Sequence, residues 1–125
     1  MSKRKGLSYE EKMINALEKL PNPLIDKKHN LEIYFINNRA RSNQDRFKHI
    51  INYKHSLLAS DIERIPRYIN SSKLKIDKER KNTSNIYIKR SGCRNEYIKI
   101  SLKIDPKSPN IAIVKTIFIT KVYKW

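Results

Sequence analysis

The amino-acid sequence predicts an α+β fold in which N-terminal helices pack on one face of a mainly antiparallel four-stranded sheet. Apolar residues recur at helical spacing in the first half of the chain, and runs of β-branched residues follow in the second half. Short links rich in turn-forming residues join those runs, which is typical of an antiparallel meander. Helices followed by a meander form one sheet packed on its helices, so we expect residues 1–125 to form a single domain.

The first helix is expected to follow a flexible basic arm, residues 1–6. Ser8 and Glu11 have the spacing of a capping box, in which each residue caps the backbone of the other. The apolar residues that follow share one helical face: Met13, Ile14, Leu17 and Leu20. Prolines at positions 21 and 23 end this helix. Residues 31–36 are rich in β-formers and predict a strand.

A second helix is predicted over residues 43–58. Its apolar positions lie on one stripe: Phe47, Ile50, Ile51, Leu57 and Leu58. Residues 60–63 repeat the capping-box pattern and predict a short helical piece, which we expect Pro66 to interrupt or restart. Residues 71–84 are polar and charged, and they predict a loop with a short strand at 74–76.

Three strands are predicted at the C-terminal end, over residues 85–90, 96–104 and 111–122. Residues 91–95 form a hairpin connection with Gly92 at a positive φ, and residues 105–110 form a longer turn. The middle strand alternates cleanly, which predicts an apolar face toward the helices and a basic face on the other side. The apolar set is Ile98, Ile100, Leu102 and Ile104, and the polar set is Lys99, Ser101 and Lys103.

The last strand is apolar on both sides, which makes its orientation harder to assign. One side carries Ile111, Ile113, Lys115, Ile117 and Ile119, and the other carries Ala112, Val114, Thr116, Phe118 and Thr120. We expect the isoleucine side to join the core, although a core position does not suit Lys115. Thr116 and Thr120 would then lie on the open face, near Lys89 and Lys99.

The charge of the chain predicts a polyanionic partner. Twenty-eight Lys and Arg residues oppose twelve Asp and Glu residues, which gives a net charge of +16 and a pI of about 10.1. A phosphate backbone is the commonest compensating polyanion, so we expect a nucleic acid, with RNA favoured. A surface that only maintains solubility, or a coding bias toward Lys, Ile and Asn, explains the same charge.

The sequence also predicts where the protein works. No apolar segment has the form of a signal peptide or a transmembrane span, and no basic amphipathic helix points to a membrane surface. The lone Cys93 fits a reducing compartment. We therefore expect a cytoplasmic protein, or one delivered to a target-cell cytoplasm by other machinery. Its oligomeric state is left open.

We expect no metal and no cofactor. One Cys and three scattered His do not form a zinc pattern, and two glycines do not form a phosphate-binding loop. RNA is cleaved without a metal when its own 2′-OH acts as the nucleophile. That reaction needs an acid/base, cations around the phosphate and a proton donor for the leaving oxygen.

Several residues are candidates for those roles. His49, on the flank of the second predicted helix, is the candidate acid/base, although a surface histidine is the simpler interpretation. Lys89 or Arg90 would bind the phosphate, and Thr116 or Thr120 would donate a hydrogen bond. We expect His29 to be solvated. The residues expected to contact nucleic acid elsewhere are Arg67, Lys99, Lys103, Tyr53 and Tyr87, each of which also suits an ordinary structural position.

Five segments together resemble the phage-associated nuclease-like domains of the superfamily that unites barnase, EndoU, the tRNA-cutting colicins and RelE. They are residues 49–50 (HI), 60–69 (SDIERIPRYI), 86–90 (IYIKR), 97–102 (YIKISL) and 116–120 (TIFIT). The resemblance covers residues 45–122. It implies a four-stranded sheet and RNA cleavage that leaves a 2′,3′-cyclic phosphate. It also implies His49 as acid/base, Lys89 or Arg90 as the phosphate-binding cation and Thr120 or Thr116 as the last-strand hydroxyl.

The sequence therefore predicts a metal-independent endoribonuclease. The resemblance adds that such domains are often toxins or phage and mobile-element effectors, which need a cognate inhibitor protein. The alternative is a non-catalytic basic protein that binds nucleic acid, and a third reading is a protein that docks on an acidic surface. Charge alone does not separate the first two, because both predict binding that weakens steeply with salt.

Overall fold

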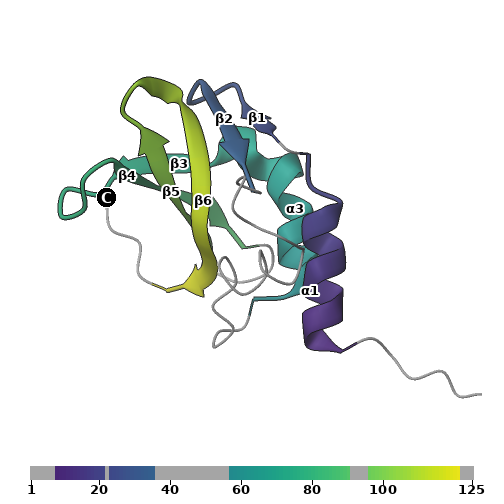
Figure 1. The fold of residues 1–125 in the computed structure, drawn as a ribbon. Helices are drawn as coiled ribbons and strands as arrows, with labels where there is room; N and C mark the ends of the chain where they lie inside the picture. The colour runs from purple at the N-terminus through teal and green to yellow at the C-terminus, as the bar shows by residue number, and fades with distance from the viewer. Residues whose placement is uncertain (1–7, 22, 36–56, 91–95, 122–125) are drawn as a thin grey trace, which may run out of the picture.

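A computed structural model describes residues 8–21, 23–35, 57–90 and 96–121, and shows an α+β fold (Figure 1). In these ranges the chain forms two α-helices, one 3₁₀ turn and six strands. In chain order they are α1 (Tyr9–Glu18), β1 (Leu24–Asp26), β2 (Leu31–Tyr34), α3 (Ala59–Tyr68), η1 (Ile69–Ser71), β3 (Lys73–Ile76), β4 (Thr83–Lys89), β5 (Tyr97–Asp105) and β6 (Ser108–Thr120).

The strands form one mixed sheet in the order β1-β2-β6-β5-β4-β3. Strands β3 to β6 make the antiparallel meander that the sequence predicts. The predicted number of four strands is wrong, because a β1–β2 hairpin extends the sheet at β6, with β2 parallel to β6. Strand β1 has only three residues, too few for a periodic signal. Asn30 closes the hairpin turn at φ 57°, a conformation that Asn tolerates better than most residues.

Helix α1 begins and ends as predicted. The Ser8 hydroxyl accepts a hydrogen bond from the Glu11 N–H (3.1 Å), and the Glu11 carboxylate accepts one from the Ser8 N–H (2.9 Å). This hydrogen bond from the Ser8 backbone, together with the Ser8 hydroxyl, lowers the pKa of Glu11. Met13 and Leu17 are fully buried, so the predicted apolar face is the face that packs on the core.

Helix α3 differs from its prediction in two ways. Its N-cap is Leu58, and Asp61 rather than Glu63 reaches back, accepting from the Leu58 N–H at 2.8 Å. The predicted capping box over residues 60–63 is therefore wrong. Pro66 lies inside the helix without interrupting it, since burial of apolar side chains on both sides of it outweighs the hydrogen bond that proline cannot donate. Of the helix predicted over residues 43–58, only Leu57 and Leu58 lie within the described residues.

Strands β5 and β6 are joined by a tighter turn than predicted. Asp105 pairs with Ser108, so the connection contains only two residues, 106 and 107, and the longer turn predicted over residues 105–110 is wrong. The Asp105 carboxylate accepts a hydrogen bond from the Lys107 N–H at 2.9 Å and so fixes the turn. Strand β6 begins correspondingly earlier and reaches a length of 13 residues.

A β-bulge at Lys115 resolves the ambiguous pattern of β6. Ser101 pairs with Thr116 and the next residue, Leu102, pairs with Val114, so Lys115 is the extra residue. The prediction that all four isoleucines face the core is wrong, because the bulge exchanges the two sides of the strand. The core residues of β6 are Ala112, Val114, Ile117 and Ile119. On the other face are Ile111, Ile113, Thr116, Phe118 and Thr120, which are all half-buried.

The hydrophobic core lies between the sheet and the two helices, which stand on the same side of it in Figure 1. Its fully buried members come from every layer: Met13 and Leu17 in α1, Ile62 and Ile65 in α3, and Ile86, Ile98, Ile100 and Ile117 in the sheet. The opposite face of the meander therefore carries the side chains that the core does not use. Within the described residues, no helix is long and apolar enough to cross a membrane.

Candidate functional site

The side chains of β3 to β6 that point away from the core fall into three rows that run across the strands. The first row is Lys73, Tyr87, Lys99 and Phe118; the second is Lys75, Asn85, Ser101 and Thr116; the third is Lys89, Tyr97 and Thr120. We call these eleven residues the lysine face. The rows contain four lysines and no acidic residue, so the lysine face carries a net positive charge.

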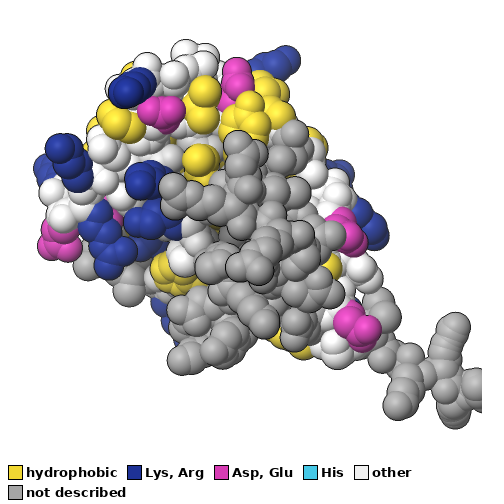
Figure 2. Space-filling model, viewed as in Figure 1, with side chains coloured by type: hydrophobic (Ala, Val, Ile, Leu, Met, Phe, Trp, Pro, Cys, Tyr) yellow, Lys and Arg dark blue, Asp and Glu magenta, His cyan; other side chains and the backbone are white. Residues whose placement is uncertain are grey.

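Lys103 continues the same pattern beside the second row. It pairs with Thr83 on one side and Ile113 on the other, and its side chain is exposed. Figure 2 shows Lys and Arg side chains gathered on the side of the molecule where β3, β4 and β5 lie in Figure 1. Several described basic side chains therefore lie close together on this side of the molecule.

Aromatic rings hold the central lysine of the first row. The Lys99 Nζ lies 5.7 Å from the Tyr87 ring centroid and 5.4 Å from the Phe118 ring centroid. Both distances are within the range of a cation–π contact, which orients the ammonium group between the two rings. Burial, with a smaller contribution from the charge of Asp77, raises the pKa of the Tyr87 hydroxyl. Tyr87 is thus a buried, neutral floor for this row.

The lysine face contains five of the ten site residues expected from the sequence, and Lys103 lies beside it. Lys89, Lys99, Tyr87, Thr116 and Thr120 all belong to the lysine face. Alternation along β5 was the sequence signal that located this surface.

Arg67 is outside the lysine face, on α3, where its guanidinium lies 5.8 Å from the Tyr68 ring centroid. His49 and Tyr53 are outside the described residues.

Arg90 has a different environment from its neighbour Lys89. Its Nε and a terminal nitrogen donate to the two carboxylate oxygens of Asp61, at 3.1 Å and 3.0 Å, and its other terminal nitrogen donates to Glu96 at 2.8 Å. Burial by itself lowers the pKa of Arg90, but these two carboxylates reverse the effect and raise it. Arg90 therefore ties the start of α3 to the end of β4, whereas the Lys89 side chain is exposed.

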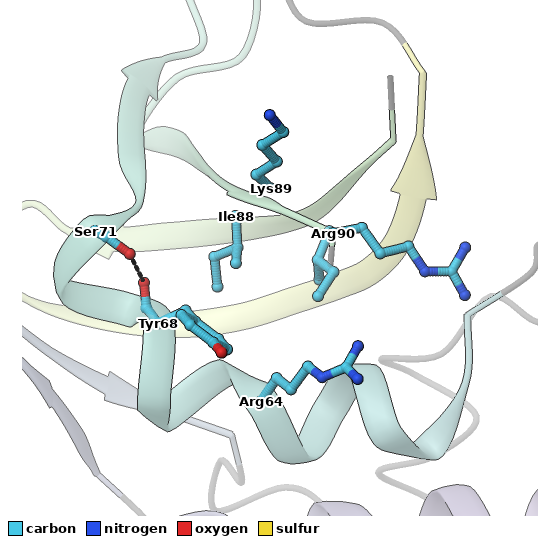
Figure 3. Close-up of a pocket in the computed structure, with 7 residues that line it drawn as sticks. Arg64, Tyr68, Ser71, Ile88, Lys89 and Arg90 are labelled. Atoms are coloured by element: carbon cyan, nitrogen blue, oxygen red, sulfur yellow. Dashed lines mark hydrogen bonds between the residues drawn. The ribbon is translucent and has the colours of Figure 1, made fainter. Parts of the chain in front are cut away.

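A cavity of about 330 Å³ opens beside this ion pair, between α3 and the end of β4 (Figure 3). Its lining residues are Arg64, Tyr68, Ser71, Ile88, Lys89, Arg90 and Ile98. Arg64 and Tyr68 are four positions apart on α3 and so share one helical face. The Ser71 hydroxyl donates to the Tyr68 carbonyl at 3.0 Å. Sequence reasoning missed Arg64 and Tyr68, because only the packing of α3 on β4 places them beside Lys89.

His29 is not solvated, so that prediction is wrong. Its Nδ1 lies 2.7 Å from the Asp26 carboxylate, and its backbone N–H donates to the same carboxylate at 3.2 Å. Asp26 is fully buried, and only 16% of the His29 side chain is exposed. The neighbouring Lys28 donates to the Ser72 carbonyl at 2.7 Å. The Asp26–His29 contacts hold the hairpin turn, and the Lys28 hydrogen bond fastens the β1–β2 hairpin to the segment between η1 and β3.

No group of three or more His, Cys, Asp or Glu side chains within the described ranges is arranged to hold a metal ion. No family model, curated protein or solved structure matches the chain.

Proposed function

We propose that this protein binds single-stranded nucleic acid, RNA in the first place, on the lysine face. The observation that carries the proposal is the set of three cross-strand rows, which place four lysines among aromatic and hydroxyl side chains with no carboxylate between them. A net charge of +16 adds long-range attraction for any polyanion.

The spacing of the lysine face suits a phosphate chain. Side chains two positions apart on a strand are about 7 Å apart, and neighbouring strands are about 4.8 Å apart. Lys73 and Lys75 are two positions apart on β3, and Lys99 and Lys103 are four positions apart on β5, a separation of about 14 Å. Several phosphates can therefore be neutralised at once, and the released counterions supply much of the binding free energy.

The aromatic side chains favour a single strand over a duplex. Tyr97 and Phe118 are half-buried on the lysine face, and an aromatic ring stacks on a base only where that base is unpaired. The hydroxyl group of Thr116, which is half-buried in the second row, is suited to hydrogen bonds with phosphate oxygens. Charge attracts the strand, while the rings select its unpaired form.

The test is fluorescence anisotropy with a labelled 12-nucleotide oligouridine at a series of NaCl concentrations. Each phosphate neutralised on a single strand contributes about −0.7 to the slope of log binding constant against log salt. We expect Lys75→Gln and Lys89→Gln each to reduce that slope by about 0.7. Lys12→Gln, at an exposed position of α1, removes the same charge from outside the lysine face and is the matched control.

Two further probes test the preference for an unpaired strand. We expect single-stranded DNA of the same sequence to bind more weakly than the RNA, and a 12-base-pair RNA duplex to bind more weakly still. Equal losses of affinity in Lys12→Gln and Lys89→Gln would contradict the proposal, because any basic surface would then bind equally well.

RNA cleavage without a metal is the second candidate function. The observation that favours it is that Lys89 and Thr120, two of the expected catalytic residues, share the third row with Tyr97 between them. In this mechanism His49 accepts the proton of the 2′-OH as that oxygen attacks the phosphorus, and Lys89 and the last-strand threonine stabilise the charged phosphate. The bond from phosphorus to the 5′ oxygen breaks, and that oxygen takes up a proton from the protonated His49.

The assay for this activity is incubation of the protein with tRNA and mRNA in excess EDTA. Cleavage that leaves 2′,3′-cyclic phosphate ends and disappears in His49→Ala and Lys89→Ala supports the enzyme. Growth inhibition on expression, relieved by His49→Ala, would further support an effector that needs a cognate inhibitor. Tight RNA binding without cleavage leaves the binding function alone, and cleavage abolished by EDTA contradicts the mechanism.

A further inference from the structure

The cavity between α3 and β4 combines an apolar floor with an aromatic wall and a basic rim. Ile88 and Ile98 line it from the sheet and are 3% and 1% exposed. Tyr68 is 38% exposed, and Figure 3 shows its ring beside the cavity on the same side of α3 as Arg64. This combination suits a flat, partly apolar ligand that also carries a negative charge.

Arg64 is the more exposed of the two arginines beside the cavity. Both Asp61 oxygens are bound by Arg90 at about 3 Å, and one of them also accepts from the Leu58 N–H. The Arg64 guanidinium is 4.0 Å from Asp61, beyond hydrogen-bond distance, and 41% of its side chain is exposed. Asp61 and Glu96 together balance the charges of Arg90 and Arg64, so Lys89 supplies the excess positive charge of the lining. The Arg64 guanidinium is still accessible to an anion from the cavity and solvent.

We infer that this cavity binds one nucleotide unit, with the base against Tyr68 and the isoleucine floor and the phosphate at Arg64. A volume of about 330 Å³ is at the lower end of the range for small-molecule sites, roughly 300–1,000 Å³. An aromatic ring stacks on any base, and the planar guanidinium of an arginine binds phosphate in a bidentate manner. The inference rests on the proposed function for the choice of a nucleotide as ligand.

Lys89 connects the cavity with the lysine face. It lines the cavity and also begins the third row, and Figure 3 shows its amine pointing away from Arg64 and α3. A strand bound along the lysine face would therefore pass Lys89 as it reaches the cavity. The nucleotide has two sources, one unit of a bound strand or a free mononucleotide, and the two require different experiments.

The first experiment is titration of the ¹⁵N-labelled protein with adenosine monophosphate, followed by the NMR shifts of the Ile88 and Ile98 amides. We expect saturable binding, with adenosine alone and inorganic phosphate alone at least tenfold weaker. Arg64→Gln and Tyr68→Leu should each weaken binding at least fivefold. Arg80→Gln, which removes an arginine from the turn at the opposite end of β4, should leave it unchanged.

Two results would overturn the inference. The first is equal affinity for inorganic phosphate and adenosine monophosphate, which indicates a non-specific anion site. The second is a loss in Arg80→Gln equal to that in Arg64→Gln, which indicates general electrostatics. The NMR spectrum of each variant reports whether it is folded, so a failure to fold is not mistaken for a loss of binding.

The second experiment repeats the oligouridine anisotropy with Arg64→Gln and Tyr68→Leu. Weaker binding of the 12-mer in both variants assigns the cavity to one unit of a bound strand, and unchanged binding assigns it to a free mononucleotide. Oligonucleotide binding without any binding of adenosine monophosphate refutes the cavity and leaves the proposed function. Mononucleotide binding without any oligonucleotide binding supports the cavity as a nucleotide site and refutes the proposed function.

Discussion

Asp61 is the residue on which the contact between α3 and β4 depends. Its carboxylate is 1% exposed, accepts a hydrogen bond from the N-cap of α3 and binds the Arg90 guanidinium through both oxygens. A buried carboxylate is tolerated only when it is paired and hydrogen-bonded, and here the hydrogen bond is local to the start of α3 whereas the cation comes from the end of β4.

Replacement of Arg90 by methionine should therefore be strongly destabilising. The change keeps much of the side-chain volume but leaves Asp61 buried without its cation, which costs about 3–5 kcal/mol of the free energy of unfolding. Urea denaturation measures the loss. The matched control is Arg67→Met, at an exposed position of the same helix, for which we expect a change within about 0.5 kcal/mol. A loss below about 1 kcal/mol in Arg90→Met would mean that the ion pair contributes little.

The capping box of α1 should make stability depend on pH in the acid range. The pKa of Glu11 is lowered in the folded protein, so its contribution is present above the unfolded pKa, about 4.3. The contribution is lost as the pH falls through the lower folded pKa. Glu11→Gln should accordingly lower the urea midpoint at pH 6 and have little effect near pH 2.5. An effect of the same size at both pH values would indicate that the charge of Glu11 is not involved.

At the scale of elements, the bulge in β6 explains why the pairing of this strand with β5 shifts by one residue at Lys115. The core residues before Lys115 (Ala112 and Val114) and after it (Ile117 and Ile119) would face opposite directions in a regular strand, and the extra residue brings them to the same face. The bulge also bends the strand and increases its twist, which lets its first half pair with β2 as well as β5.

Deletion of Lys115 should be tolerated. Val114 and Thr116 would then be adjacent and would still point to opposite faces, so every core residue of β6 keeps its place. We expect cooperative urea unfolding with a stability loss of no more than about 2 kcal/mol, within the usual range for a single change. Deletion of Lys99 is the control, because it removes a lysine from the regular part of β5 and turns one half of that strand inside out. Unfolding of both variants would contradict the assignment of the bulge.

The elements show where sequence reasoning succeeds. The same capping-box pattern occurs at Ser8 and at Ser60, and only the first predicts a helix start correctly. The first box depends on its own four residues, whereas Asp61 in the second is already bound by Arg90, 29 positions away. The pairing of β3 to β6 follows from alternation and short turns. The pairing of β1 and β2 with β6 depends on a distant partner that no local pattern reveals.

The candidate site also has a part that the sequence predicts and a part that only the tertiary packing produces. Alternation along β5 correctly predicts a basic face containing Lys99 and Lys103, since side-chain direction is a local property of a strand. Local pattern gave no sign of the ion pairs of Arg90 or of the cavity beside Tyr68, because both arise where α3 packs on the end of β4. The buried Asp26–His29 contact was missed for a similar reason, since burial of a turn depends on what covers it.

For the whole molecule, the charge of +16 predicts a stability that rises with ionic strength. Lysines crowded on one side repel each other in the folded state, and salt shortens the screening length from about 10 Å at 0.1 M to about 3 Å at 1 M. We expect the Tm to increase by several degrees over that range. A variant with glutamine at Lys73, Lys75, Lys89 and Lys103 should have a higher Tm at low salt and a smaller response. A Tm that is flat or falls with salt would show that repulsion is negligible.

The parallel pairing of β2 with β6 has a consequence for the order in which the protein folds. Ile33 pairs with Ala112, about 80 positions further along the chain, whereas neighbouring strands of the meander are joined by short links. Closing so long a loop has a larger entropic cost than closing a hairpin, and contacts of this kind slow folding. We therefore expect the meander to form first and the N-terminal hairpin to dock on it afterwards. The surface proposed to bind RNA is complete at the earlier of these two steps.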